Sequence, residues 1–497
     1  MDHIVVHDQD HVVVVLRDYE KGENIQLEEQ TITLKEDVKR GHKVALKPIK
    51  SGDAVHKYGF PIGFATVDIE EGTWVHTHNI KTTLEGTLDY NTYQPMEESS
   101  NTHSEPQERT FQGYVRKNGD IGIRNEIWIV NTVGCINKTA EVLAKQGDQM
   151  NFEGVDAVSH FPHPFGCSQL GDDLHATQKI LSNLVAHPNA AGVLVLGLGC
   201  ENNYIDAFKK VIGDYDEDRV KFLSVQQVED ELEAGLELIE ELAEYAASFK
   251  REPLPLSKLK VGLKCGGSDG LSGITANPLV GVFSDKLIAH GGSTVLTEVP
   301  EMFGAETILM DRAQDEQVFN GIVDMVNGFK DYFIKHDQVV YENPSPGNKE
   351  GGITTLEEKS LGCVQKGGFS PVVDVLPYGG RLKKNGLSLL QGPGNDLVSV
   401  TALSASGAHM VIFTTGRGTP FGGPVPTIKM STNTPLFERK KNWIDFNAGE
   451  LVQGKKMEEV SEELLDYVVE LASGNVRTHN EKHGFKEIAL FKDGVIL

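Results

Sequence analysis

Each of the five cysteines stands next to a glycine, and most of them follow an apolar run of strand length. A residue just past the end of a buried strand points into the crevice where α/β proteins build their sites. A single cysteine in such a place is often only a small buried hydrophobe. Five of them together indicate metal ligation or a reactive pocket, and they are Cys135, Cys167, Cys200, Cys265 and Cys363.

Two histidines, His76 and His78, end the last strand-like run of the N-terminal region. In an extended strand, residues two apart point to the same face, so both imidazoles can reach one metal ion. Two histidines on the surface of a strand are also common without a metal. The spacing alone leaves both interpretations open.

The segment 160–173 concentrates imidazole, thiol and carboxylate groups. No second cysteine lies two to four residues from Cys167, which disfavours a structural zinc site. Asp172 and Asp173 suit the first turn of the helix expected next, where carboxylates interact favourably with the helix dipole. His160 and Cys167 therefore remain the functional candidates of this segment.

Two glycine-rich turns are similar to nucleotide-binding loops, but each lacks a required residue. The turn that begins Gly197-Leu-Gly199 has Asn202 where the third glycine of a dinucleotide fingerprint belongs. The turn 266–273 lacks the lysine of a phosphate-binding loop. This second turn can still offer backbone N–H groups and the Ser268 hydroxyl to a carboxylate, or it is a plain glycine turn.

Charged side chains in the glycine- and proline-rich loops of the C-terminal half are candidates for binding an anion. Lys349 lies in the loop 343–352, and Arg417 lies between two glycines. Such loops usually let the backbone approach a ligand closely. Glu298 and Glu301 follow another strand-like run, where carboxylates ligate a cation, transfer protons or cap the next helix.

The composition excludes several classes of protein. The net charge of −25 over 497 residues disfavours binding to nucleic acid or to an anionic membrane. Part of the acid fills the solvent face of a helix expected at 228–249. No apolar run has the length of a membrane span and no signal pattern begins the chain, so we expect a cytoplasmic protein. The odd number of cysteines disfavours a disulfide scaffold.

The elements that must position these groups fall into three regions. Residues 1–92 alternate short β-branched runs with glycines, which is typical of a small all-β domain. The polar stretch within 93–112 predicts a linker. Apolar strands followed by helices predict two α/β domains with largely parallel sheets, at 113–250 and 258–497, and a proline-containing break at 251–257 separates them.

Several long blocks of the sequence resemble the altronate/galactarate dehydratase family, and the similarity runs over essentially the whole chain. The resemblance implies that the N-terminal β region is a SAF (β-clip) domain. Within this family, the pair His76 and His78 is typical of the altronate type. The blocks are 166–173, 197–203, 265–278, 297–306, 343–348 and 413–420.

The resemblance implies a hydro-lyase of hexuronate catabolism that converts D-altronate to 2-dehydro-3-deoxy-D-gluconate and water. Removal of the C2 proton creates an enediolate-like species, and a divalent metal would stabilise its charge. A general base takes this proton, and a general acid assists departure of the C3 hydroxyl. Galactarate dehydration, or elimination from another sugar acid, is the alternative within the family. A sugar-acid sensor without turnover is the alternative outside catalysis.

The residue roles implied by the resemblance form one predicted site. We expect His160 to be the general base, with Lys349 and Asp269 as further catalytic residues. Substrate binding is assigned to Ser268, Arg417 and Asn348. The metal ligands are expected to be His76, His78, Cys135, Cys167, Cys200 and Glu201.

The cofactor that the resemblance implies is Fe²⁺, with Mn²⁺ or another divalent metal as an alternative. Mixed imidazole and thiolate ligation suits iron or zinc better than magnesium. An iron–sulfur cluster on three of the cysteines is a further alternative. The expected partner is a small sugar acid, with no nucleic acid and no membrane, in a chain that can form a homo-oligomer.

Overall fold

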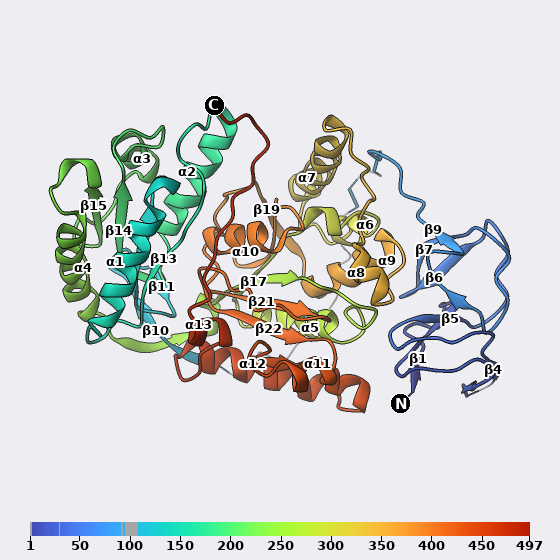
Figure 1. Cartoon of the computed structure of the whole chain (residues 1–497). Helices are drawn as coiled ribbons and strands as arrows, with labels where there is room; N and C mark the ends of the chain where they lie inside the picture. The colour runs from blue at the N-terminus through green and yellow to red at the C-terminus, as the bar shows by residue number, and fades with distance from the viewer. Residues whose placement is uncertain (1, 29, 91–92, 95–107) are drawn as a thin grey trace.

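The computed structural model describes residues 2–28, 30–90, 93–94 and 108–497. Its N-terminal β domain consists of short antiparallel strands joined by glycine turns (Figure 1). The strands form sheets in the orders β1-β2-β5-β8, β3-β4 and β6-β7-β9. They are β1 (His3–Ile4), β2 (Val12–Val15), β3 (Asn24–Gln26), β4 (Thr31–Thr33), β5 (Lys43–Ala45), β6 (Ala54–Lys57), β7 (Phe60–Ala65), β8 (Trp74–Val75) and β9 (Ile80–Lys81).

The second domain is built on a parallel sheet of strand order β13-β12-β14-β15. Alternate residues of β12 face opposite layers: Ile127 and Ile129 pack with α1 and α4, and Trp128 and Val130 pack with α2. Its strands are β10 (Thr110–Val115), β11 (Ile121–Gly122), β12 (Glu126–Asn131), β13 (Val158–His160), β14 (Ala190–Gly197), β15 (Val220–Ser224) and β16 (Arg251–Pro255). Its helices are α1 (Asn137–Gln149), α2 (Gly171–Val185), α3 (Ile205–Ile212) and α4 (Glu231–Ala247).

The proline-containing break expected at 251–257 contains a strand, which corrects that prediction. β16 pairs with β10 in a small antiparallel sheet, with Pro253 opposite Gln112 and Pro255 opposite Thr110. Prolines are tolerated there because β16 is an edge strand and needs partners on one side only. The linker predicted within 93–112 falls mostly outside the described residues, and its end, from Thr110, already belongs to β10.

The C-terminal domain contains a parallel sheet of seven strands in the order β19-β20-β18-β17-β21-β22-β23. The strands are β17 (Lys260–Cys265), β18 (Ser293–Leu296), β19 (Val372–Leu376), β20 (Gly386–Leu390), β21 (Met410–Thr415), β22 (Thr427–Ser431) and β23 (Phe446–Asn447). The helices are α5 (Ala276–Ala289), α6 (Glu306–Met310), α7 (Glu316–Lys335), α8 (Pro346–Glu350), α9 (Leu356–Val364), α10 (Asp396–Ala405), α11 (Thr434–Arg439), α12 (Met457–Ala472) and α13 (His479–His483).

Continuous apolar cores join the three domains. Helices α2 and α10 pack together, so one core runs from the second domain into the C-terminal domain. On the other face of the large sheet, α5 and α12 share a core that continues into the β domain. Figure 1 shows the β domain and the second domain at opposite ends, with the C-terminal domain between them. The predicted fold class, a small β domain followed by two α/β domains, is confirmed.

None of the helices in the described part of the chain combines the length and the apolar character that a membrane span requires.

Candidate active site

A cavity of about 300 Å³ lies between the β domain and the C-terminal domain. We call it the arginine cavity because Arg40 of the β domain lines it together with Arg417 and Arg439 of the C-terminal domain. Asp269 and Asn433 complete its polar wall. Except for Gly351, which follows α8, the residues from the C-terminal domain follow β17, β21 and β22, so the cavity lies at the carboxyl edge of the large sheet, where α/β folds bind ligands.

Among the described residues that line the arginine cavity, Asp269 is the one with a carboxyl group, since the other ionisable groups are guanidinium groups that stay protonated. Its carboxylate accepts hydrogen bonds from Thr432 Oγ1 at 3.0 Å and from Ser272 Oγ at 3.1 Å. Burial nevertheless raises the pKa of Asp269, because these hydrogen bonds offset the loss of water only in part. Gly416 makes room for the carboxyl group, since a Cβ there would lie 2.3 Å from Asp269 Cγ.

Two buried polar atoms at this site have no hydrogen-bond partner among the described residues: Nε of Arg40 and Oγ of Ser268. Asn348 donates from Nδ2 to the carbonyl of Ser268 at 2.9 Å, so the serine backbone is fixed while its hydroxyl stays uncommitted. Buried polar groups without partners are rare, and each one needs an explanation. Arg40 lines the arginine cavity itself, whereas Ser268 lines a smaller void that Asp269 also lines.

Behind Asp269 lies a group of buried charged residues that we call the charge cluster. A void of about 10 Å³, lined by Ser268, Asp269 and Lys359 among others, lies between it and the arginine cavity. Lys264 lies 2.5 Å from Glu298, and Lys359 lies 2.9 Å from Glu301. Its members are Lys264, Cys265, Glu298, Glu301, Lys359, Cys363 and Lys366.

The charge cluster carries two marks of a functional site. Glu298 has a φ of 73°, a left-handed conformation that strains any residue with a side chain and persists mainly where function requires it. Lys359, followed by Lys264 and Lys366, lowers the pKa of Glu301 despite the opposing effect of burial. The site therefore keeps this carboxylate ionised inside the domain.

Cys265, Glu301 and Cys363 form the one group of three potential metal ligands whose donor atoms lie within 4.8 Å of one another among the described residues. The sulfurs of Cys265 and Cys363 lie 3.3 Å apart and are not bonded. Lys366 Nζ already lies 3.1 Å from the sulfur of Cys265, and Lys359 pairs with Glu301. These ammonium groups already supply the positive charge that a metal ion would bring. The three side chains of Cys265, Glu301 and Cys363 therefore do not fit a metal ion.

The β domain contributes two buried lysines to the same side of the C-terminal domain. Lys43 and Lys57 both lie 2.8 Å from the carboxylate of Glu358 in α9. Burial favours the neutral form of Glu358, but the two lysines outweigh it and lower the pKa to about 2. Burial lowers the pKa of Lys43 to about 8. The interface between the β domain and the C-terminal domain is thus held by ion pairs without solvent.

His76 and His78 lie in a turn, which corrects the extended geometry expected for them. Asn79 closes the turn by donating to the carbonyl of His76 at 3.0 Å and by accepting from its backbone N–H at 2.9 Å. Both imidazoles lie against the indole of Trp74, with ring centroids 5.2 and 5.1 Å away. His76 is buried against Thr354 of the C-terminal domain, and burial lowers its pKa to about 4, so the ring is neutral.

The cysteines of the second domain, Cys135, Cys167 and Cys200, lie past the ends of β12, β13 and β14, as predicted, and all three are exposed. Glu201 is buried beside them and accepts hydrogen bonds from Thr132 Oγ1 at 2.5 Å and from the backbone N–H of Gly199 at 2.6 Å. Burial alone would raise the pKa of Glu201, but these hydrogen bonds lower it. Glu201 therefore organises the loop that carries Cys200.

The predicted metal ligands do not form one site within this chain. The β domain, with His76 and His78, and the second domain, with Cys135, Cys167 and Cys200, lie at opposite ends of the molecule (Figure 1). The sequence shows strand ends but not which domain packs beside which. The ligand set therefore separates into a histidine pair and a cysteine group.

His160 ends β13 in the second domain, half-buried, and burial lowers its pKa. It does not line the arginine cavity, so the predicted base and the predicted substrate residues lie in different domains. Lys349 lies in α8, and Arg417 donates to the carbonyl of Gly347 in the same helix at 3.2 Å. The structure thus brings Ser268, Asp269, Asn348, Lys349 and Arg417 to one region.

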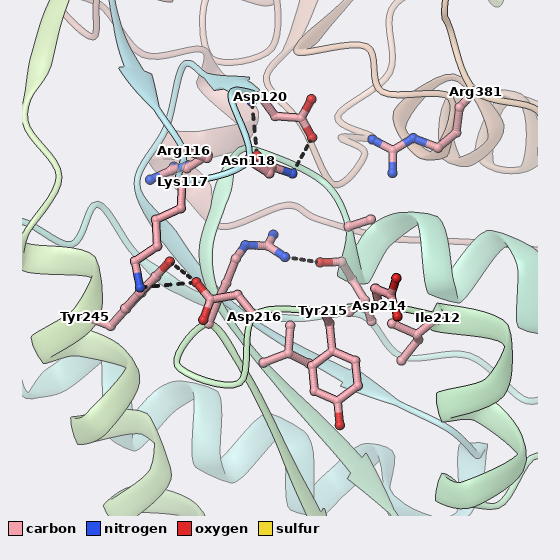
Figure 2. Close-up of a pocket in the computed structure, with 14 residues that line it drawn as sticks. Arg116, Lys117, Asn118, Asp120, Ile212, Asp214, Tyr215, Asp216, Tyr245 and Arg381 are labelled. Carbon is pink, nitrogen blue, oxygen red and sulfur yellow. Dashed lines mark hydrogen bonds and ion pairs between the residues drawn. The ribbon is translucent and has the colours of Figure 1, made fainter.

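A larger cavity of about 680 Å³ lies between the second domain and Arg381 of the C-terminal domain (Figure 2). Lys117 pairs there with Asp216 at 3.4 Å, and Tyr245 donates to Asp216 at 2.7 Å (Figure 2). Arg219 donates to backbone carbonyls. Most of its charged side chains are already paired, and none of the residues predicted from the sequence lines it. We therefore place the candidate active site at the arginine cavity.

The buried lysines Lys264, Lys43 and Lys57 are not among the residues predicted from the sequence. Lys264 lies near the end of the largely apolar strand β17. Its partner Glu298 follows a different strand, β18, so the pair is not visible in the sequence. A lysine at the end of an otherwise apolar strand is the signal that could have found it, because a fully buried lysine needs a partner. Lys43 and Lys57 carried no comparable signal, since lysines in short strands usually face solvent.

Three family models cover nearly the whole chain. Residues 1–83 match the altronate/galactarate dehydratase SAF domain. Residues 113–247 match the D-galactarate dehydratase/altronate hydrolase second domain, and residues 256–496 match the D-galactarate/altronate dehydratase C-terminal domain.

Full-length relatives agree with these matches. The chain is 57% identical over 500 residues to altronate dehydratase of Bacillus subtilis (strain 168), covering 99% of each. It is 55% identical over 499 residues to altronate dehydratase of Escherichia coli (strain K12), covering 100% of each. Galactarate dehydratase (L-threo-forming) of the same E. coli strain is 33% identical over 519 residues, with 98% of this chain and 96% of the relative covered.

Proposed function

Because the chain belongs to the D-galactarate/altronate dehydratase family, we propose that it dehydrates D-altronate to 2-dehydro-3-deoxy-D-gluconate at the arginine cavity. The observation that supports this location is a cavity of about 300 Å³ lined by three arginines and by Asp269, whose pKa is raised. Altronate is preferred over galactarate because the relatives of 57% and 55% identity are altronate dehydratases, against 33% for the galactarate enzyme.

The arginines supply the positive charge that the anionic substrate needs. A chain of net charge −25 repels a sugar acid at long range, so its binding site must compensate locally. Nε of Arg40 finds no hydrogen-bond partner within the described part of the chain, whereas Arg417 already contacts Glu350 at 3.2 Å. Guanidinium groups bind carboxylates through two parallel hydrogen bonds. We assign the substrate carboxylate to Arg40, with Arg417 and Arg439 beside it.

Asp269 is assigned the proton transfers. As a carboxylate it takes the C2 proton, and as the resulting carboxylic acid it donates that proton to the departing C3 hydroxyl, which leaves as water. Burial raises the pKa of Asp269, which makes the carboxylate a stronger base toward the C2 proton than an exposed aspartate would be. The hydroxyl of Ser268 and the side chain of Lys349 are proposed to position the sugar hydroxyls.

We propose a divalent metal activator, Fe²⁺ or alternatively Mn²⁺, held by His76 and His78. The donors fit, since His76 is neutral and its Nε2 has no hydrogen-bond partner among the described residues. His42 of the same domain contacts both His76 and the carbonyl of Glu350, next to the arginine cavity. When bound, such an ion supplies Lewis acidity that stabilises negative charge on the substrate.

The experiment is a turnover assay with D-altronate, galactarate and other aldonates, with anaerobic addition of Fe²⁺ or Mn²⁺. We expect 2-keto product from altronate. Asp269→Asn should lower kcat by about 10²–10⁴-fold, the usual contribution of one acid–base group. Arg40→Met should mainly raise KM. Arg381→Met, an arginine of the larger cavity, is the matched control and should leave both constants unchanged.

Three outcomes would overturn parts of this proposal. Stable binding of altronate without turnover under any metal condition would indicate a sensor. Galactarate turnover above altronate turnover would reassign the substrate. Unchanged metal content and turnover in His76→Ala/His78→Ala would remove the histidine pair from the metal site.

A further inference from the structure

Three exposed cysteines of the second domain have no role in the proposed dehydration. Cys135, Cys167 and Cys200 are all free thiols. They follow β12, β13 and β14, which are adjacent in the sheet, so all three lie at the same carboxyl edge. The position is the one in which parallel sheets place ligands.

Hydrogen bonds hold the three cysteine-bearing loops against one another. Gly134, beside Cys135, donates to the carbonyl of Phe165 at 2.8 Å. Asn203, just past Cys200, donates from its backbone to the carbonyl of Gly166 at 2.9 Å and from Nδ2 to the carbonyl of Thr132 at 3.1 Å. The three loops therefore form one connected unit.

Close backbone contact explains the glycine that precedes Cys167. Gly166 has a φ of 98°, and a Cβ there would lie 1.9 Å from the carbonyl oxygen of Thr132. A side chain would therefore push the Cys167 loop away from the Cys135 loop. Glu201 ties the third loop to the first by a hydrogen bond that it accepts from Thr132. These contacts hold the three cysteine-bearing loops in fixed positions relative to one another.

We propose that Cys135, Cys167 and Cys200 bind an iron–sulfur cluster of the [4Fe–4S] type. Three cysteine thiolates are soft ligands suited to such clusters. Their sulfurs do not form a group within 4.8 Å of one another, as ligands of a single ion would. Thiolates on one ion lie about 3.8 Å apart at a metal–sulfur bond of about 2.3 Å. In a cluster each thiolate binds a different iron, which separates the sulfurs further.

The surroundings of the thiols also suit a cluster. Gln226 donates from Nε2 to the sulfur of Cys200 at 3.6 Å, and hydrogen bonds to cysteine sulfur tune cluster potentials. Among the described residues, no lysine or arginine contacts these three sulfurs, in contrast to Cys265, which contacts Lys366. Assembly replaces three S–H bonds by three Fe–S bonds and releases three protons to solvent, with sulfide and equal parts of Fe²⁺ and Fe³⁺ supplied externally, so that no further oxidant is needed. One iron then has no cysteine ligand.

This proposal does not depend on the proposed dehydration, because its readout is cluster content. The full chain is reconstituted anaerobically with equal parts of Fe²⁺ and Fe³⁺ and with sulfide, and iron, acid-labile sulfide and visible absorption are measured. We expect about four iron and about four sulfide per chain, as the cluster type requires. Cys135→Ser/Cys167→Ser/Cys200→Ser should lose the cluster, and Cys363→Ala, a buried cysteine outside the group, should keep it.

A second measurement uses the unmodified chain and so does not require a variant to fold. Peptide mapping after alkylation should show Cys135, Cys167 and Cys200 modified in the cluster-free protein and protected in the reconstituted protein. Iron bound without acid-labile sulfide, or a cluster retained by the triple variant, would overturn the proposal. The Asp269→Asn variant should keep full cluster content, which separates failure of this proposal from failure of the dehydration site.

Discussion

The two parallel sheets of this chain end in sites of opposite character. At the carboxyl edge of the second-domain sheet, three thiols are exposed, and the carboxylate of Glu201 accepts a hydrogen bond from the backbone N–H of Gly199. At the carboxyl edge of the seven-stranded sheet, two thiols are buried among three lysines and two glutamates. Both edges occupy the position where α/β folds bind ligands.

The comparison shows that burial, more than topology, decides what each edge can do. Exposed thiols can lose a proton to water and bind a soft metal or cluster at small cost. Buried charges cannot move or find water, so they form fixed pairs that hold neighbouring loops in place. The first edge is suited to a cofactor, and the second is suited to a preorganised substrate site.

The largest expected difference between the two edges is thiol reactivity. In the metal-free protein, iodoacetamide should modify Cys135, Cys167 and Cys200 directly, because they are exposed. Cys265 and Cys363 can react only after the charge cluster opens. With an opening free energy of about 5 kcal/mol, their rates should be more than about 10³-fold lower. Time-resolved peptide mapping by mass spectrometry measures all five rates in one sample.

Similar rates at all five cysteines would contradict the contrast between the edges. Unfolded protein in denaturant is the control, since every thiol should then react at a comparable rate. Fast modification of Cys265 alone would show that the charge cluster opens locally.

Much of the exposed edge could be predicted from the sequence. The apolar runs that end near Cys135 and Cys200 are long, and their glycines mark where the strands stop. Cys363 shows the limit of this reasoning, because its glycine does not mark a turn. Gly362 lies within α9, where a Cβ would come within 3.3 Å of Gly273 Cα, so this glycine allows close packing. That requirement is set by a neighbour distant in sequence.

The buried edge could not be predicted in the same way. A lysine within an apolar strand is costly unless a carboxylate from another segment meets it, and the sequence does not show which segments meet. The prediction of one metal site failed for the same reason, because His76 packs on the C-terminal domain rather than on the second domain. Local patterns determine strands and turns, whereas contacts between domains determine which candidate residues form one site.

The next largest effect is expected from Lys264→Met in the charge cluster. Lys264 contacts Glu298 at 2.5 Å and Asp396 at 2.9 Å, and its side chain is fully buried. Removing one partner of a buried ion pair leaves an uncompensated charge and usually costs about 3–5 kcal/mol. Denaturant unfolding should therefore show a loss of this size. Lys138→Met, which removes an exposed lysine of the other edge, is the matched control; equal losses would contradict the comparison.

A smaller, pH-dependent effect is expected at Glu358, which pairs with Lys43 and Lys57. The pKa of this carboxyl group is about 2 in the folded chain and 4.5 without these partners. Its stabilising contribution is complete above about pH 4.5 and is lost as the pH falls toward 2. The shift corresponds to about 3 kcal/mol at 1.36 kcal/mol per pKa unit. Lys43, with a pKa of about 8, stays protonated throughout this range.

The measurement compares the unfolding free energy of the wild type and of Glu358→Gln between pH 6 and pH 3. The difference should be constant above pH 5 and shrink below about pH 4.5. In that range Glu358 takes up a proton in the unfolded wild type but not in the folded one, whereas the glutamine of the variant takes up none in either state. A difference that stays constant across the whole range would show that Glu358 is not held ionised by the lysines.

The smallest effect is expected for an exposed ion pair in the second domain. Lys138 and Glu141 lie 2.5 Å apart in α1, with side chains 87% and 49% exposed. A double-mutant cycle with Lys138→Ala and Glu141→Ala should give a coupling of about 0.2–0.5 kcal/mol, since water screens the charges and the long side chains lose entropy. High salt should reduce this coupling further. The same cycle on Lys43 and Glu358 should give a larger, salt-insensitive value. A coupling above about 1 kcal/mol for the exposed pair would mean that solvent exposure does not decide how strongly an ion pair of this chain contributes to stability.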